Sequence, residues 1–432
     1  MTSITAMIVS SVIFVVALAL IFTEKMNRSI TGIAGAALMV GIGTAFEFYS
    51  QDEAIAAIDF NTLGLLFGMM ILVALLEPTG FFQYLAVWAA RLSKGRPVRL
   101  MVLLGTVTTI LSMFLDNVTT VVLIAPVTVL ISEILGLNPV PYLMAEALLS
   151  DTGGVATLVG DPPNVLIASA AGFSFNDFLT HSLPIVLFAW FAALLLLRYL
   201  FRDELQKMPA NTEAVLQLNP NEALNDRKTI NRVLVVLGVA MFFFFIHHNL
   251  HIQPSMIALS AASIALVWIQ PDLHETLQRI EWNVLIFFGA LFVMVGGLES
   301  SGVLHQLAEL IGRAGNLSPI VFGVITIWVV AVLSAIVDNI PITIALIPVF
   351  AELEQSGINV RPLWWALAFG AGFGGNGTII GSTANVFIAS LSERTKHPIT
   401  SQLWNKRGLP VMIVTCFIGS VLFVLAYSYL SR

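Results

Sequence analysis

The sequence predicts an all-α integral membrane protein with two inverted repeats, about 10 transmembrane helices, two re-entrant hairpins and two broken helices. Three observations predict this fold class. Of the 432 residues, 57% are hydrophobic and 11% are charged, with a mean hydropathy of +0.90. Apolar stretches long enough to cross a bilayer recur along the chain. The second half of the sequence also repeats the first at a nearly constant shift.

The composition excludes a soluble globular protein, in which about 25% of residues would be charged. Lipid must cover part of so much apolar surface. The net charge of −6 and the lack of a basic stripe exclude nucleic acid as a partner. The single cysteine, Cys416, excludes an internal disulfide and a cysteine-based zinc site, and no metal or cofactor is expected. The first apolar stretch lacks the features of a cleavable signal peptide and is interpreted as a span.

A helix needs about 20 apolar residues to cross a bilayer. The stretches that meet this need are Thr5–Phe22, Ile30–Phe46, Asn61–Leu76, Leu143–Ala171, Leu183–Phe201, Val233–His247, Pro254–Ile269, Asn283–Leu298, Leu363–Leu391 and Leu409–Leu430. Two further stretches, Met101–Ile131 and Pro319–Phe350, are each interrupted by an Asp-Asn pair. Their lengths suit re-entrant hairpins with tips at Asp116 and Asp338, and a pair of full spans is the alternative.

The distribution of positive charge supports this layout, because cytoplasmic loops carry an excess of Lys and Arg. With the N-terminus outside, all but three of the 20 Lys and Arg residues fall inside, and the three are Arg313, Arg361 and Arg432. The sequence therefore predicts a multi-pass protein of the cell (inner or plasma) membrane, with both termini outside and a central cytoplasmic linker.

The internal repeat is visible without alignment. At a shift of 222 residues Asn61 falls on Asn283 and Asp116 on Asp338, and at a shift of 221 Asn164 falls on Asn385. The predicted organisation is a first half over 1–205, a linker over 206–230 and a second half over 231–432. Each half holds an odd number of full spans, so the halves must be inverted, and inverted-repeat transporters place their site at the midplane where the halves meet.

The Asp-Asn pairs at the hairpin tips are the first candidate site. A carboxylate at membrane depth is costly, so by default it indicates an ion or proton pathway. Asp116 and Asp338 each precede a segment that can start a half-helix with its N–H groups facing the site. Each Asp can instead only cap that helix, and both roles are compatible.

The second candidate site is a pair of glycine-rich segments, 153–164 and 374–385, each in the middle of a span. Their glycines and prolines forbid an uninterrupted helix, and the freed backbone groups must be satisfied by protein, ligand or ion. A packing kink is the alternative. The first half carries extra carboxylates, with Asp161 opposite Ser382 and Asp151 opposite Gly372. A shared proton, or a cation beside the solute, would explain this asymmetry, although Asp161 could simply cap a helix.

These segments supply all the candidate site residues, none of them catalytic or metal-ligating. Those expected to carry a proton or ion are Asp116, Asp338, Asp161 and Asp151. Those expected to bind the solute are Asn117, Thr119, Thr157, Asn164, Asn339, Asn376, Thr378, Ser382 and Asn385.

The same motifs resemble those of the arsenite permease and sodium–proton antiporter (ArsB/NhaD) family, part of an ion transporter superfamily that includes the P protein and the dicarboxylate and citrate permeases. The motifs are Leu115-Asp-Asn-Val-Thr-Thr120, Gly160-Asp-Pro-Pro-Asn164, Asp338-Asn-Ile-Pro341 and Gly374-Gly-Asn-Gly-Thr378. The resemblance implies paired hairpins, an elevator-like movement, a homodimer and a soluble ATPase subunit as partner. Sodium–dicarboxylate members have Ser-Asn-Thr at the hairpin tips, so the aspartates here favour a proton or another cation handled by carboxylate.

The leading hypothesis is secondary active transport, namely proton-coupled efflux of arsenite or antimonite across the lipid bilayer. Neutral As(OH)3 would be held by hydroxyl and amide groups, since a single cysteine excludes thiolate capture. The alternatives are a Na+/H+ antiporter and an inorganic anion or carboxylate transporter of the same superfamily. An intramembrane aspartyl protease also needs two carboxylates but has no need of a duplicated framework, so no enzymatic activity is expected.

Overall fold

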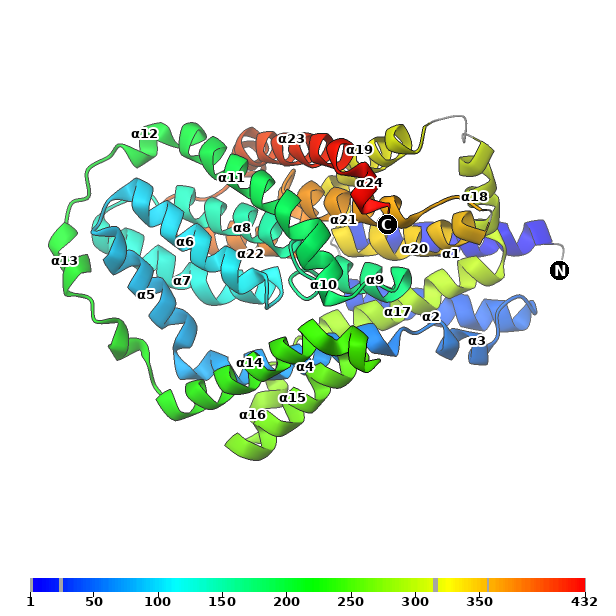
Figure 1. Cartoon of the computed structure of the whole chain (residues 1–432), viewed down its shortest axis with the longest axis horizontal. Helices are drawn as coiled ribbons and strands as arrows, with labels where there is room; N and C mark the ends of the chain where they lie inside the picture. The colour runs from blue at the N-terminus through cyan, green and yellow to red at the C-terminus, as the bar shows by residue number, and fades with distance from the viewer. Residues whose placement is uncertain (1–2, 23–25, 314–317, 356, 432) are drawn as a thin grey trace.

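The computed structural model describes residues 3–22, 26–313, 318–355 and 357–431, and over these ranges the chain is helical without a β-strand (Figure 1). Within the described part, nine helices are long and apolar enough to cross a membrane. The predicted all-α membrane fold is confirmed. Two of the charges used for the orientation, Lys25 and Arg432, lie outside the described residues, and the orientation itself stays a prediction.

The elements follow the same order in both halves. The first half contains α1 (Ser3–Phe22), α2 (Arg28–Ala45), α3 (Gln51–Ala56), α4 (Phe60–Leu76), η1 (Glu77–Thr79), α5 (Phe81–Ser93), α6 (Pro97–Ser112), α7 (Asn117–Leu135), α8 (Val140–Gly154), α9 (Pro162–Ala171), α10 (Phe175–Asp177), the π-turn η2 (Phe178–Ser182) and α11 (Leu183–Leu200). The second half contains α14 (Arg227–Leu250), α15 (Pro254–Ile269), α16 (Leu273–Gln278), α17 (Trp282–Ser300), α18 (Val303–Arg313), α19 (Pro319–Ile336), α20 (Asn339–Gln355), α21 (Arg361–Gly375), η4 (Ile379–Gly381), α22 (Thr383–Glu393), α23 (Ser401–Leu425) and α24 (Tyr427–Leu430).

The repeat extends to element boundaries. A shift of 222 residues carries the ends of α3 onto those of α16, and a shift of 221 carries the ends of α8 onto those of α21. The predicted hairpins are α6–α7 and α19–α20, and the predicted broken helices are α8–α9 and α21–α22. The apolar stretches do not predict the short helices α3, α5, α16 and α18. They predict that the last span begins at Leu409, whereas α23 begins at Ser401 and continues through Pro410.

The helices pack in two groups. In the first, called the scaffold group, α4 packs on α15 and α2 packs on α17, with α1 and α14 beside them. In the second, called the hairpin group, the hairpins and broken helices pack with α11 and α23. Each hairpin also contacts the second segment of the other half's broken helix, α7 with α22 and α20 with α9. This exchange joins the two halves at the centre of the molecule.

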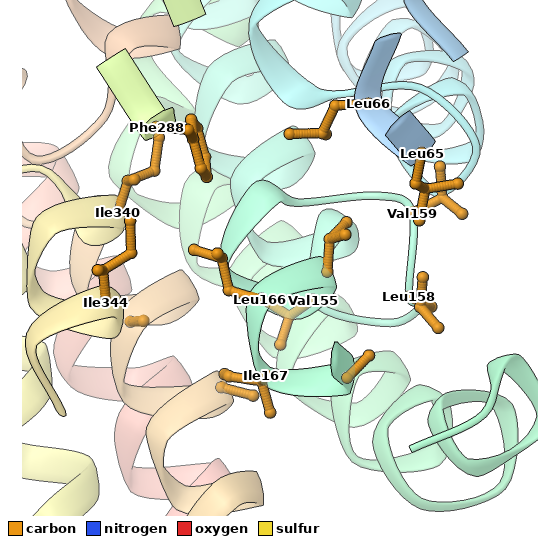
Figure 2. Packing of buried hydrophobic residues seen from close by; sticks show 14 of the residues in the cluster. Leu65, Leu66, Val155, Leu158, Val159, Leu166, Ile167, Phe288, Ile340 and Ile344 are labelled. Carbon is orange, nitrogen blue, oxygen red and sulfur yellow. The ribbon is translucent and has the colours of Figure 1, made fainter. Parts of the chain in front are cut away.

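Apolar side chains fill the contact between α9, α20 and α4. Leu166 and Ile167 of α9 lie near Ile340 and Ile344 of α20, and Leu65 of α4 lies close to Val159 of the loop before α9 (Figure 2). All these residues belong to one buried cluster. The cluster therefore surrounds the polar tips of the hairpins with apolar material.

The segment predicted as a linker, 206–230, is folded against the first half. It carries α13 (Thr212–Gln217) and η3 (Pro220–Ala223), after the short α12 (Arg202–Leu205), and runs past the ends of α5 and α7 (Figure 1). The N–H of Ala210 donates to the carbonyl of Leu135 over 2.8 Å, and the N–H of Asn225 donates to Thr79 over 2.8 Å. Val215 is buried. The second half begins with α14 at Arg227, and the three-part division stays a prediction.

Close packing of α4 on α15 depends on Gly68. A Cβ at this position would lie 2.6 Å from the carbonyl carbon of Ala258 and 2.8 Å from its Cβ. Gly68→Ala is expected to destabilise the protein by about 1–3 kcal/mol through overpacking. Gly238→Ala is the matched control, since a Cβ there meets nothing within 4 Å. Thermal unfolding in detergent should show a lower midpoint for Gly68→Ala alone, and equal midpoints would contradict this packing.

Candidate functional site

The tip of the first hairpin is organised by Asp116, which precedes α7. Its carboxylate accepts the N–H of Thr119 over 2.8 Å and the Thr119 hydroxyl over 2.5 Å. Asp116 is therefore an N-cap, because its side chain satisfies a free N–H of the first turn. It also lines a central cavity, so the capping and site roles coexist.

The tip of the second hairpin carries an ion pair to the scaffold group. Nη1 of Arg28, at the start of α2, lies 3.1 Å from Oδ2 of Asp338 and donates to the Thr383 hydroxyl over 2.7 Å. The guanidinium also lies over the ring of Phe287, 5.5 Å from its centroid. The side chains of the pair are 26% and 18% exposed, so solvent screens their attraction only partly. The charge pattern predicts Arg28 as a cytoplasmic loop charge, whereas the structure places it on the cavity wall.

The breaks in the two split helices are held by equivalent asparagines. Nδ2 of Asn164 donates to the carbonyls of Gly154 and Thr157, over 3.1 and 2.7 Å. Nδ2 of Asn385 donates to Gly375 and Thr378, over 2.9 and 3.1 Å. These amides satisfy carbonyls that the missing helical turn leaves free.

Each break is also tied to the tip of its own hairpin. The Thr157 hydroxyl donates to the carbonyl of Met113, and the Thr378 hydroxyl donates to that of Ala335 over 2.5 Å. Gly154 and Gly160 let the two ends of the first break touch, because a Cβ on Gly160 would lie 2.6 Å from the Gly154 carbonyl oxygen. The broken helices are thus built as specific structures rather than simple kinks.

Two buried carboxylates of the first half accept the hairpin asparagines. Oδ1 of Asp151 accepts Nδ2 of Asn117 over 2.8 Å and the Ser382 hydroxyl over 3.1 Å. Asp161 accepts Nδ2 of Asn339 over 3.2 Å at Oδ2. Asp161 precedes α9 but makes no capping hydrogen bond, so its side chain serves the centre of the molecule and not the helix end. The extra carboxylates therefore lie where hairpins and broken helices of both halves meet.

Glu281 brings a further carboxyl group from the scaffold group. It occupies the N-cap position of α17 but makes no side-chain cap. Its counterpart in the first half, Asp59, caps α4 through the N–H groups of Asn61 and Thr62. Oε1 of Glu281 lies 3.4 Å from Oγ1 of Thr119, whose one proton is donated over the shorter distance to Asp116. Glu281 therefore does not cap its helix as Asp59 does, and its carboxyl group faces the first hairpin tip.

Residues of both hairpin tips, a broken helix and the scaffold group line one small cavity of about 40 Å³, and Asp151 and Thr119 lie behind it. It is smaller than the roughly 150 Å³ that accommodate a benzene molecule, so a solute larger than a few waters requires opening. Its polar lining consists of Arg28, Asp116, Asn117, Asp161, Glu281, Asp338, Asn339, Ser382 and Thr383. Four carboxyl groups face one guanidinium, and their full ionisation would leave excess negative charge that only protons or cations can offset.

The structure brings together six of the predicted site residues at this cavity, namely Asp116, Asn117, Asp161, Asp338, Asn339 and Ser382. The other predicted residues do not line it. Asp151 and Thr119 lie directly behind it, and Thr157, Asn164, Thr378 and Asn385 hold the breaks. Nδ2 of Asn376 donates to the Thr152 hydroxyl over 2.9 Å. For these residues a role in solute binding stays a prediction.

Sequence reasoning missed Arg28, Glu281 and Thr383. Arg28 stands at the start of an apolar span, where a charge is usually a loop charge. The repeat offered a signal for Glu281, because it occupies the position of Asp59 with a longer carboxylate. No equivalent signal existed for the direction in which Arg28 points.

Comparison with known proteins defines the class as an all-α membrane transporter. The crystal structure of the Alcanivorax borkumensis YdaH transporter, described as having an unusual topology, matches with a TM-score of 0.61 over 98% of both chains at 16% identity. A family model described as "Citrate transporter" (CitMHS) matches residues 18–370, and the chain belongs to that family.

Two relatives are consistent with membership of a transporter family. An uncharacterized transporter of Mycobacterium tuberculosis is 39% identical over 97% of this chain and 99% of its own length. The human P protein is 32% identical over 95% of this chain, which spans 58% of that protein. These findings support the ion transporter superfamily and not the arsenite permease and sodium–proton antiporter branch in particular. The homodimer and the ATPase subunit stay predictions.

The ion pair between Arg28 and Asp338 should be measurable by a double-mutant cycle. Arg28→Gln and Asp338→Asn should each lower stability, and the double variant should lose less than the sum, with a coupling of about 1–3 kcal/mol. The exposed pair of Arg202 and Asp203, at 3.6 Å with side chains 60% and 86% exposed, is the control and should show no measurable coupling. Additive effects at Arg28 and Asp338 would mean that the pair does not hold the hairpin tip.

Proposed function

We propose that this transporter couples the movement of protons or Na+ to that of a small anion, a carboxylate or an inorganic anion. The observation that carries the proposal is the small cavity in which carboxyl groups of both hairpin tips and of a broken helix face a single arginine. Asp116, Asp161 and Asp338 are its proton or cation carriers. Carboxyl groups at the meeting point of inverted repeats have a task in coupling, in addition to the capping contact of Asp116 and the ion pair of Asp338.

Arg28 is the group that selects an anion. In the structure its charge is matched by Asp338, and its hydrogen bonds go to Asp338 and Thr383. When Asp338 takes up a proton, the guanidinium keeps its charge and loses its partner, so a carboxylate or oxyanion can replace it. Proton binding and anion binding then favour each other, which is the requirement for symport. The name of the matching family, "Citrate transporter", agrees with a carboxylate as solute.

Proton-coupled efflux of arsenite or antimonite is the second candidate. It is favoured by the neutral part of the cavity wall, where amides and hydroxyls of Asn117, Asn339, Ser382 and Thr383 could hold As(OH)3. Cys416, buried on α23, is not among the lining residues, so capture would rely on oxygen and nitrogen groups alone.

Transport by purified protein in lipid vesicles separates the candidates. Uptake of radiolabelled citrate, phosphate or sulfate that is driven by an acid exterior and abolished by a protonophore would support anion symport. Arsenite accumulation into vesicles with an acid interior would support efflux by exchange. Sodium-induced proton release without movement of any of these solutes would overturn both in favour of a Na+/H+ antiporter.

Neutralising a carrier should abolish coupling while keeping the fold. Asp116→Asn, Asp161→Asn and Asp338→Asn are each expected to reduce gradient-driven uptake to the background of empty vesicles, since an amide cannot carry a proton. Asp226→Asn is the control. Hydrogen bonds from Thr229 lower the pKa of the exposed Asp226, and Asn can still cap α14 there. Wild-type uptake by any of the three variants would remove that residue from the proposal.

A further inference from the structure

A second buried carboxyl group lies away from the cavity, on α8. Glu146 is fully buried, and its Oε1 accepts the hydroxyl of Thr128 on α7 over 2.5 Å. Its other oxygen, Oε2, is buried without a hydrogen-bond partner. One neutral donor cannot replace the hydration of a carboxylate in an apolar interior, so the carboxyl group of Glu146 is protonated.

Polar side chains connect the region of Glu146 to Asp151 along the contact between α7 and α8. Glu146 and Ser150 are one helical turn apart on α8, and Asp151 follows. On α7, Asn117, Thr120 and Thr128 are spaced along one face. These side chains of α7 and α8 form a polar strip. Hydrogen bonds join the two helices at both ends of the strip, from Thr128 to Glu146 and from Asn117 to Asp151.

The middle of the strip has spare hydrogen-bonding capacity. Thr120 Oγ1, Ser150 Oγ and Asp151 Oδ2 are buried and, like Glu146 Oε2, have no partner. Buried polar atoms are nearly always paired, so these oxygens require an explanation. Hydroxyl groups both donate and accept, so together with ordered water between them they are suitable for passing a proton.

The second half shows that the fold does not require these polar groups. The positions equivalent to Thr120 and Thr128 are Ile342 and Phe350 on α20. The positions equivalent to Glu146, Ser150 and Asp151 are Leu367, Ala371 and Gly372 on α21. The same hairpin and broken helix are thus packed with apolar residues in one half and with a polar strip in the other.

Charged side chains on the neighbouring helices are exposed or have other contacts, so they do not compensate a charge on Glu146. The helices that pack on α8 are α6, α7, α11, α21, α22 and α23. Their exposed charged side chains are Arg99, Glu133, Arg198, Glu393 and Lys406. Among their partly buried ones, Arg407 lies 3.7 Å from Glu204, and Arg361 lies over the ring of Phe173. Asp116, which caps α7, is bonded to Thr119.

We propose that Glu146 is a second proton-binding site, which exchanges its proton with Asp151 through Thr120 and Ser150. The proton leaves Glu146 Oε2 and a proton arrives on Asp151 Oδ2, with ordered water bridging the unpaired oxygens and each hydroxyl taking up one proton as it releases another. Asp151 then passes the proton toward the cavity. Asn117 and Ser382 each bond Asp151 and also line the cavity. The proposal rests on proton coupling as the proposed function, and it assigns the route of the proton.

The test compares two kinds of transport by Glu146→Gln, with radiolabelled citrate and arsenite as probes. Solute exchange at equal pH needs no net proton movement and should remain. Uptake driven by a pH gradient should become about 100-fold slower or more. Glu133→Gln, which removes an exposed carboxylate from α7, is the control and should keep both. Gradient-driven uptake at the wild-type rate in Glu146→Gln would overturn the proposal.

A measurement without solute keeps the inference separate from the proposed function. Infrared spectra of the wild type should contain the C=O stretch of a protonated carboxylic acid that is missing in Glu146→Gln, whichever solute is transported. Absence of that band would overturn the site. Glu146→Leu, the residue of the second half, should fold with an unchanged or higher unfolding midpoint and lack gradient-driven uptake. A large loss of stability would instead assign Glu146 to packing.

Discussion

The structure depends on satisfying the backbone where two helices break inside an apolar interior. Carbonyls freed at such a break have no water to bond, and each would cost several kcal/mol if left alone. Asn164 and Asn385 solve this problem in the same way, each by bonding carbonyls at both sides of its break. Thr157 and Thr378 then fix each break to its hairpin tip. The cavity can exist because these four side chains use their polar groups for the backbone.

On this symmetric framework the charges are distributed asymmetrically. Asp161 stands where the second half has Ser382, and Glu281 stands where the first half has the capping Asp59. A structural demand imposed by the fold would appear in both halves, as the asparagines at the breaks do. Asp161, a carboxylate without a counterpart in the second half, therefore fits the proposed coupling, which treats the two sides of the membrane differently. Vectorial coupling of a proton to a solute is a process of this kind.

Much of the fold followed from the sequence, because long apolar stretches, polar interruptions and a gapless repeat are direct consequences of the bilayer as solvent. The meeting of both Asp-Asn pairs followed from the inverted repeat. Short helices such as α3 and α16 could not be predicted, since six residues are too few to show the helical periodicity of apolar positions. The roles of Arg28 and Glu281 did not follow either. A long side chain at a span end can reach solvent or the interior, and only the packing of α2 and α17 decides between them.

The same contacts join the two helix groups and hold the coupling charges. Arg28 and Glu281 belong to scaffold helices, whereas Asp338 and Thr119 belong to hairpin tips. Opening the small cavity by moving the hairpin group along the scaffold would separate both contacts. Separation of this mostly buried ionised pair costs free energy, whereas a protonated Asp338 leaves Arg28 free to pair with an incoming anion. In the proposed mechanism, movement is then cheapest when the carboxylate and the arginine are both occupied, which would tie the conformational change to the presence of the cation and the solute together.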